Sequence, residues 1–267
     1  MSDIGSRILR CDAGFVAVNK LPGEATEGAR EGLACLPSLL AAELPGAGYP
    51  PPPPGDALPQ PTAAHRLDVP VTGCALFARS GAALRLLNAA FAEGAVEKRY
   101  WAVVEPPRGD PPDPRFLESQ DLEQARGVEL AHWISFDPKA NKSVARDKPG
   151  RGLKKAILRY SYVGRGRDYL FLEIELVTGR HHQIRAQLER IGLRVKGDLK
   201  YGARRSEKGG GIRLHARSLS FRDLSGGDSR VTVQADPPLQ DGLWQAFQEE
   251  ARARCPRPQN KSKIAVE

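Results

Sequence analysis

The carboxylate most suited to chemistry in this sequence is Asp68, which follows His65, Arg66 and Leu67. It lies between a proline-rich stretch and a predicted strand, so we expect it in a loop or at a strand end, where catalytic groups are often displayed. By default, a carboxylate next to a guanidinium is a surface ion pair that contributes little to stability. Here the apolar residues 69–71 would exclude water, while Arg66 favours the charged form. A charged carboxylate in a semi-apolar pocket suits nucleophilic or general-base chemistry.

A second group of reactive side chains lies in residues 178–185, which read TGRHHQIR. They place two arginines, two histidines, an amide and a glycine at a predicted turn from strand to helix. Free N–H groups at a helix N-terminus, together with guanidinium groups, form a site for phosphate or carboxylate. The alternative is structural: Arg180 caps local carbonyls, and His181 and His182 lie on the surface.

A metal site is a further alternative, because His65, Asp68 and His182 would supply two imidazoles and one carboxylate. Adjacent histidines such as His181 and His182 splay apart, and no metal-ligand spacing recurs elsewhere in the sequence. We therefore expect no metal at these residues.

A third piece is Lys98-Arg99-Tyr100, at the start of a predicted strand. Lys98 and Tyr100 are two residues apart and so share one face of that strand. Aromatic rings stack on extruded bases and cations hold phosphates. The alternative is that Tyr100 packs in the core, which is the commoner role of a strand tyrosine.

Short apolar strands and amphipathic helices must position these groups. Residues 170–176 alternate apolar and polar side chains, as in a strand with one buried face. Ile184, Leu188 and Ile191 recur at helical spacing, with Arg185 beside that stripe. We predict strands at 14–19, 74–78, 100–105, 128–136, 156–162, 169–177, 214–221 and 231–235, and helices at 33–44, 82–92, 181–191 and 243–252. These elements predict an α+β fold with one mixed sheet.

Three further stretches are typical of connectors or tails. Residues 46–61 include five consecutive prolines, Pro50 to Pro54, which favour a stiff surface loop; a ligand for a proline-recognition module is the alternative. Residues 106–114 form a linker rich in Pro, Asp and Gly. With no internal repeat, we expect a single catalytic domain over residues 1–253 and a basic, flexible tail over residues 254–267.

The composition excludes several classes of protein. A chain of 267 residues with 40% hydrophobic and 27% charged residues can bury a core and does not resemble a disordered protein. No run approaches the ~20 apolar residues that a membrane span needs, and the charged N-terminal residues argue against a signal peptide. The four cysteines lie far apart, which argues against a zinc module and a secreted disulfide scaffold. We therefore expect a cytoplasmic protein.

The net charge of +8 is unevenly distributed. Residues 141–223 carry 21 Lys and Arg against 8 Asp and Glu, a balance of +13, whereas the rest of the chain is mildly acidic. A polyanion is the partner that such a stretch favours, and a solvated cationic surface is the alternative.

Five stretches in fixed order resemble the RluA-type pseudouridine synthases over residues 14–235. They are 18–23 (VNKLPG), 65–68 (HRLD) with Thr72-Gly73, 98–100 (KRY), 178–185 (TGRHHQIR), and 197–202 (GDLKYG) before 214–216 (LHA). The resemblance implies a mostly antiparallel sheet core with flanking helices and a central active-site cleft. It also implies an enzyme that isomerises uridine within RNA to pseudouridine, exchanging the C1′–N1 bond for C1′–C5.

The resemblance also implies roles for individual residues. Asp68 matches the catalytic carboxylate, which attacks the sugar or the base or abstracts the C2′ proton, and the sequence does not choose among these routes. Arg180 matches the arginine that pairs with that aspartate, and Tyr100 the tyrosine that stacks on the target base. Arg66 matches the arginine that fills the space of the flipped nucleotide, and Ile184 an apolar residue of the pocket. We expect the remaining RNA contacts at His65, Lys98, His182 and Arg185.

The implied partner is structured RNA, either ribosomal or transfer RNA. The target base must be extruded and held by stacking, and the cationic residues 141–223 would contact phosphates. Because nothing is oxidised and no group is carried away, no cofactor or metal is expected. We expect a monomer with no membrane association, no obligate protein partner and no separate N-terminal RNA-binding domain.

The sequence departs from the family pattern at three places: His181 replaces the usual Thr, residues 69–72 replace a more polar pattern, and Leu21-Pro22 is offset from the usual Lys-Pro. These departures leave open a catalytically impaired RNA-binding or RNA-chaperone protein on the same fold. A glycoside hydrolase is a second alternative, but it needs two carboxylates at a set separation, and none accompanies Asp68 in the motifs.

Overall fold

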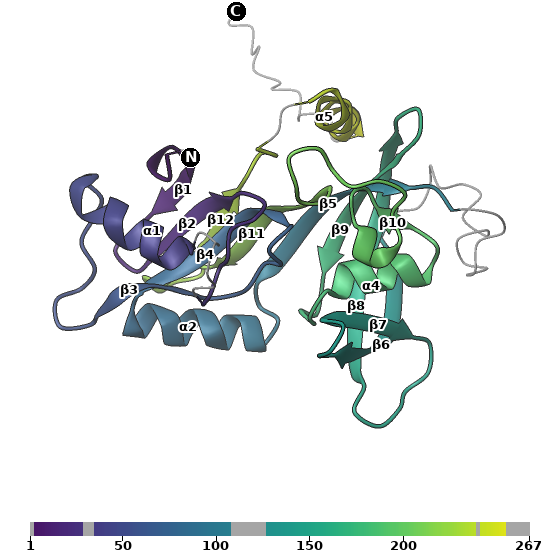
Figure 1. Cartoon of the computed structure of the whole chain (residues 1–267). Helices are drawn as coiled ribbons and strands as arrows, with labels where there is room; N and C mark the ends of the chain where they lie inside the picture. The colour runs from purple at the N-terminus through teal and green to yellow at the C-terminus, as the bar shows by residue number, and fades with distance from the viewer. Residues whose placement is uncertain (1–2, 29–34, 108–126, 239–240, 255–267) are drawn as a thin grey trace, which may run out of the picture.

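The structure is a computed structural model that describes residues 3–28, 35–107, 127–238 and 241–254 (Figure 1). Its strands are β1 (Ile8–Cys11), β2 (Phe15–Lys20), β3 (Ala57–Ala63), β4 (Thr72–Ser80), β5 (Glu97–Glu105), β6 (Val128–Asp137), β7 (Lys142–Arg146), β8 (Lys154–Arg165), β9 (Leu170–Leu176), β10 (Arg194–Val195), β11 (Leu214–Arg222) and β12 (Arg230–Gln234). Its α-helices are α1 (Leu36–Glu43), α2 (Gly81–Ala92), α4 (Gln183–Arg190) and α5 (Gly242–Arg254).

The twelve strands of the described residues form one sheet in the order β1-β2-β4-β11-β5-β9-β8-β6-β7, with β3, β10 and β12 attached at β4, β5 and β11. Between these named strands, only β4 and β11 pair in parallel. Strands β1–β4, β11 and β12 occupy one half of Figure 1 and β6–β9 the other, with β5 running between them. The α+β class with a mostly antiparallel sheet is therefore confirmed.

Helices cover both faces of the sheet. Successive residues of β2 and β5 alternate between two cores, as expected for strands buried on both sides. One core packs α1 and α4 through Leu40 and Leu188, and it also holds Tyr100. The opposite face packs α2 through Leu87 and α5 through Phe247. The face of α1 and α4 is the one that carries the functional groups.

Most predicted elements are present with shifted ends. Four strands were not predicted because their sequences lack a clear apolar alternation: β1, β7 and β10 are short, and β3 contains two prolines. Residues 50–56 connect α1 to β3 without regular structure. Most of the predicted linker at 106–114 and nearly all of the predicted tail at 254–267 lie outside the described residues. No helix of the described residues is long and apolar enough to cross a bilayer.

Candidate active site

Asp68 lies in the loop between β3 and β4, and two other segments of the chain hold that loop. The buried ammonium of Lys20 donates to the carbonyls of Val69 and Val71, with N–O distances of 2.9 and 2.6 Å. The Val69 carbonyl also accepts from Gly23 N–H, and the next carbonyl accepts from Ile212 N–H. The position of the Asp68 backbone is thus fixed by residues that are distant in sequence.

Gly73 allows β11 to approach the start of β4. Its φ is +110°, and a Cβ at this position would lie 2.2 Å from the carbonyl oxygen of Ala216. Only glycine fits without shifting a strand. The close approach of the two parallel strands brings Leu214, at the start of β11, into the wall of the pocket that Asp68 faces.

The turn from β9 to α4 is held by the side chain of Gln183. Its Oε1 accepts from the Thr178 hydroxyl at 2.8 Å and from Arg180 N–H at 2.9 Å. His182 precedes the helix with a left-handed φ of 50°, a conformation that non-glycine residues rarely adopt. This turn sets the direction in which the first residues of α4 point.

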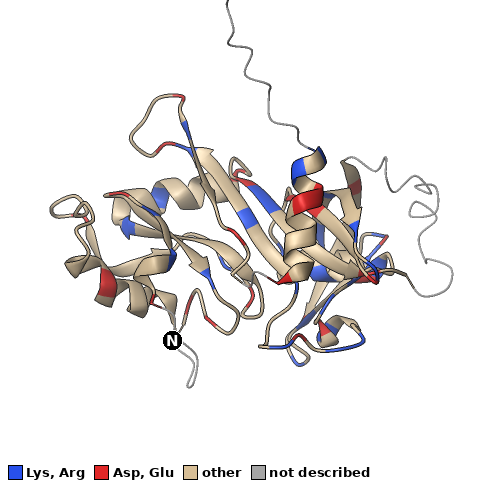
Figure 2. Cartoon of the chain, turned by 90° about the horizontal axis from the view of Figure 1, so that it is seen from above, with Lys and Arg blue, Asp and Glu red and all other residues tan. Residues whose placement is uncertain are grey.

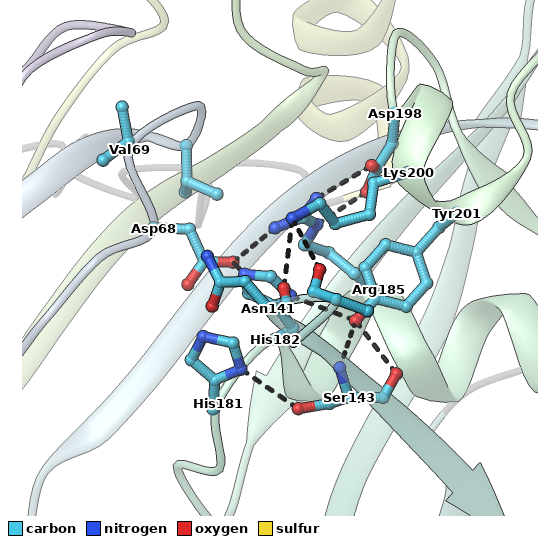
Figure 3. A network of polar contacts seen from close by, with 12 residues as sticks. Asp68, Val69, Asn141, Ser143, His181, His182, Arg185, Asp198, Lys200 and Tyr201 are labelled. Atoms are coloured by element: carbon cyan, nitrogen blue, oxygen red, sulfur yellow. Dashed lines mark hydrogen bonds and ion pairs between the residues drawn. The ribbon is translucent and has the colours of Figure 1, made fainter. Parts of the chain in front are cut away.

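Arg185 on α4 is the charge partner of Asp68 (Figure 3). Its Nη1 donates to Asp68 Oδ2 at 2.9 Å, while Nε and Nη2 donate to the two oxygens of Asp198 at 2.6 and 2.8 Å. Burial by itself lowers the pKa of Arg185, but its hydrogen bonds to Asp198 and the charges of Asp198 and Asp68 raise it overall. The guanidinium therefore stays charged and bridges one buried carboxylate and one that faces the pocket.

The predicted pairing of Arg180 with Asp68 is wrong. Arg180 is exposed, and its Nε donates to the carbonyl of Lys155 at 3.1 Å. Arg180 precedes the left-handed turn at His182, whereas Arg185 comes after that turn, on α4, and points at the Asp68 loop. Arg180 still lines the same pocket as Asp68, so a role at its rim stays a prediction.

The pocket in front of Asp68 contains about 470 Å³ of empty space, part of it open to solvent. Seven of the nine predicted site residues line it: Arg66, Asp68, Tyr100, Arg180, His182, Ile184 and Arg185. The Asp68 side chain is 23% exposed, while the Tyr100 and Ile184 side chains form apolar wall. Burial, reinforced by the charge of Asp68, raises the pKa of Tyr100, so its phenol stays neutral.

The other two predicted residues lie elsewhere. His65 stacks on Phe91 of α2, and its Nε2 accepts from Leu76 N–H at 3.2 Å. Lys98 is buried on β5 and does not line the pocket. Because His65 faces the core of the α2 side, His65, Asp68 and His182 are not brought together as the alternative metal site requires.

His182 is held inside the wall of the pocket. Its Nδ1 lies 3.0 Å from the hydroxyl of Tyr201, which in turn donates to the carbonyl of Ser143. Burial, followed by the nearby charge of Arg185, lowers the pKa of His182 to about 3. The 3.6 Å distance between His182 Nε2 and Asp68 Oδ2 is therefore a contact of a neutral imidazole and not an ion pair.

The cationic residues 141–223 contribute to both halves of the molecule, since they include β7, β8 and β9 in one half and β11 in the other. Figure 2 shows Lys and Arg of the chain in both halves. Several of their arginines pair with carboxylates from the acidic remainder of the chain: Arg159 with Glu129, Arg185 with Asp68, Arg213 with Asp241, Arg217 with Asp236 and Arg222 with Asp228. The charge asymmetry thus contributes partly to intramolecular ion pairs.

Sequence reasoning from the residues missed two of the groups that build the site, Asp198 and Lys20. Both lie inside motifs that were quoted for the resemblance, yet no role followed from their spacing. The one available signal for Asp198 is that it is an acidic residue within a strongly cationic stretch. Its burial beside Arg185 follows only from the fold.

Comparisons with known proteins agree with this geometry. The profile of the "RNA pseudouridylate synthase" family matches residues 15–190. An uncharacterized RNA pseudouridine synthase of Zymomonas mobilis is 28% identical over 90% of this chain and 96% of its own length. A tRNA pseudouridine synthase C of Haemophilus ducreyi is 32% identical over 68% of this chain and 73% of its own. Ribosomal large subunit pseudouridine synthase C of Escherichia coli O157:H7 is 27% identical over 71% of this chain and 56% of its own.

A solved structure shares the fold: the human protein "RNA Pseudouridylate Synthase Domain Containing 4" superposes with a TM-score of 0.64 at 20% identity, covering 93% of this chain and 94% of that one. The chain belongs to the RNA pseudouridylate synthase family. Within it, the relatives place the chain with the RluA-type enzymes, as the five motifs predicted, and it is an isomerase that acts as an RNA pseudouridine synthase.

Proposed function

We propose that this enzyme converts uridine in structured ribosomal or transfer RNA to pseudouridine and that Asp68 is its catalytic carboxylate. The observation that carries the proposal is the partly exposed Asp68 carboxylate, which faces a pocket and is held from behind by Arg185. Relatives named for transfer RNA and for the large ribosomal subunit support both RNA classes.

The chemistry breaks the bond between C1′ of the ribose and N1 of the uracil, turns the base, and joins C1′ to C5. The hydrogen at C5 leaves as a proton and N1 takes up a proton, so the product is an isomer of uridine. The carboxylate of Asp68 serves as nucleophile or as base, and the hydrogen bond from Arg185 Nη1 holds it beside the apolar wall of the pocket. No redox step is involved.

The walls of the pocket suit a flipped pyrimidine nucleotide. The ring of Tyr100 offers a stacking surface for the base, and Ile184 adds apolar contact on the α4 side. Arg66 is exposed at the rim, with its side chain 70% accessible, where it can occupy the space left in the RNA helix. Extrusion of the base costs a few kcal/mol, which stacking and phosphate contacts offset.

Access to RNA and release of the product need no second subunit in this proposal. We retain the expectation of a monomer that acts in the cytoplasm without an obligate protein partner. Affinity should fall steeply with salt, because exposed cations at the rim such as Arg66 and Arg180 would contact phosphates.

The test uses unmodified ribosomal and transfer RNA carrying tritium at uridine C5. Wild-type protein should release tritium from at least one RNA class, and Asp68→Asn should release none while still binding RNA. Release by Asp68→Asn at the wild-type rate would remove Asp68 from the mechanism. Binding of both RNA classes by the wild type without any release would favour the RNA-binding or chaperone alternative.

A further inference from the structure

The hairpin of β6 and β7 presents an exposed aromatic ring beside the active site. Phe136, near the end of β6, is 49% exposed and lies opposite Ser143 of β7 in the register of the two strands. Ser143 contacts the His181 ring nitrogen Nδ1 through its hydroxyl, at 3.1 Å. The face of the hairpin that carries Phe136 is therefore turned toward the strand-to-helix turn of the site.

A continuous row of rings connects Phe136 to the catalytic carboxylate. The Phe136 ring meets the His181 ring edge-on, with centroids 4.4 Å apart, and His181 stacks on His182 at 3.8 Å. His182 is the residue whose Nε2 lies 3.6 Å from Asp68. A base that stacked on Phe136 would thus lie on the same side of the molecule as the base in the pocket, with the rings of His181 and His182 between them.

Cations flank this row on the side of the hairpin. Lys200 donates to the carbonyls of Ala140 and Asn141 and so holds the tip of the hairpin (Figure 3). Lys142 lies 4.7 Å above the ring of Tyr201, and Arg66 and Lys200 are close enough to His181 to lower its pKa after burial does. An exposed aromatic ring among cations is complementary to an unpaired nucleotide, whose base stacks while its phosphate is neutralised.

We propose that Phe136, backed by His181, is the stacking platform for an unpaired base immediately next to the target uridine. The proposal rests on the proposed function, because it takes the pocket at Asp68 as the site of the target. The proposal also gives a role to His181, the position at which this chain departs from the family's usual Thr. The His181 imidazole packs edge-on against the Phe136 ring and holds it in place.

The test compares Phe136→Ala, Phe136→Leu and Phe136→Tyr, with Leu86→Ala on α2 as the control for loss of an exposed apolar side chain, since Leu86 is 51% exposed and remote from the site. The probe is a labelled single-stranded oligoribonucleotide with one uridine between two purines, measured by fluorescence anisotropy. We expect Phe136→Ala and Phe136→Leu each to weaken binding about tenfold. Phe136→Tyr and Leu86→Ala should bind as the wild type does.

Two further probes, each with one purine replaced by an abasic site, identify the stacked base. One of them should bind the wild type about tenfold more weakly, and Phe136→Ala should not weaken that probe further, because one contact cannot be lost twice. Binding of the original probe by Phe136→Leu as tightly as by the wild type would overturn the proposal. An equal further loss of affinity for both abasic probes in Phe136→Ala would also overturn it. A wild type that binds as expected but releases no tritium from RNA would refute the proposed function and not this surface.

Discussion

Two clusters of ion pairs, each built around a buried arginine, lie on opposite faces of the same sheet, and we propose that only the one with Asp68 is catalytic. On the α4 face, Arg185 bridges Asp68 and Asp198. On the α5 face, Arg213 pairs with Glu207 and Asp241, and Glu207 also pairs with Lys196. The two arginine side chains are equally buried, 4% and 5% exposed.

The clusters differ in charge balance, although each of them lines a pocket. The α5 cluster contains two cations and two carboxylates and is neutral, whereas the α4 cluster has one cation for two carboxylates and keeps one negative charge. That charge lies on Asp68, at a pocket with an apolar wall. Burial, pairing and a nearby pocket are thus common to both clusters, and the balance of charge is the feature that distinguishes the proposed site.

The largest contrast should come from the same chemical change in each cluster. Asp68→Asn should lower tritium release from RNA by more than about a thousandfold, since it removes the reactive oxygen. Asp241→Asn should leave release within about twofold of wild type, since it changes only a structural pair. If both variants lost activity equally, the charge-balance argument would be refuted.

A smaller contrast should come from the two arginines. Arg185→Met leaves the buried carboxylate of Asp198 unpaired and should cost about 3–5 kcal/mol in urea unfolding. Arg213→Met should cost less, because Glu207 keeps its pair with Lys196 and Asp241 is partly exposed. In the milder variants Arg185→Lys and Arg213→Lys the charge remains but the fork geometry is lost. We expect kcat to fall only in Arg185→Lys; a matching fall in Arg213→Lys would show that the clusters are not separable.

The rim should be less sensitive than the buried bridge. Arg180→Met removes an exposed side chain that contacts a backbone carbonyl and not Asp68. We expect it to raise KM for RNA, with kcat nearly unchanged and kcat/KM reduced less than by Arg185→Lys. Steady-state tritium release distinguishes the two parameters, and a dominant kcat loss in Arg180→Met would contradict a role confined to the rim.

The smallest effect is on stability against pH. Burial lowers the pKa of His65 and His215 to about 4 and that of His182 to about 3, so all three stay neutral in the folded state at pH 5. The unfolded chain takes up protons on them near pH 6.5, so the free energy of unfolding should decrease as pH falls from about 6.5 toward 4. Urea unfolding at several pH values measures the slope.

A control variant separates the histidines from the carboxylates. His215→Gln should flatten the decrease between pH 6.5 and 4, because one proton-binding group is lost from the unfolded chain. The carboxyls of Glu207 and Asp241 have lowered pKa values because their hydrogen bonds to Arg213 outweigh burial, so their contribution should disappear only at still lower pH. No change of slope in His215→Gln would contradict the assignment.

The sequence predicts strands and helices where periodicity is strong. Residues 169–177 alternate cleanly and form β9 over Leu170–Leu176, whereas the proline-containing β3 and the short, polar β7 carry no such pattern. Pairing with neighbours in the sheet, and not local preference, makes strands of these two segments.

The candidate site also contains residues that the sequence identifies and residues that only the fold brings together. Asp68 and Tyr100 were located by residue type and motif, and both line the pocket. The charge partner of Asp68 could not be identified from the sequence, because Arg180 and Arg185 belong to the same motif. Only the left-handed turn at His182 determines which of the two arginines points at the Asp68 loop. Asp198 approaches Arg185 through the tertiary fold, which no spacing rule encodes.

The hydrogen bonds that hold the Asp68 loop limit which changes this loop can accept. The loop carbonyls accept from Lys20, Gly23 and Ile212, and Gly211 lies so close to the Pro70 carbonyl that a Cβ there would be 3.0 Å from it. Grafting residues 65–71 from a relative would import a segment without its anchors. A graft that keeps the conformation of this loop should therefore include residues 20–23 and 211–212 as well, because these residues hold its carbonyls.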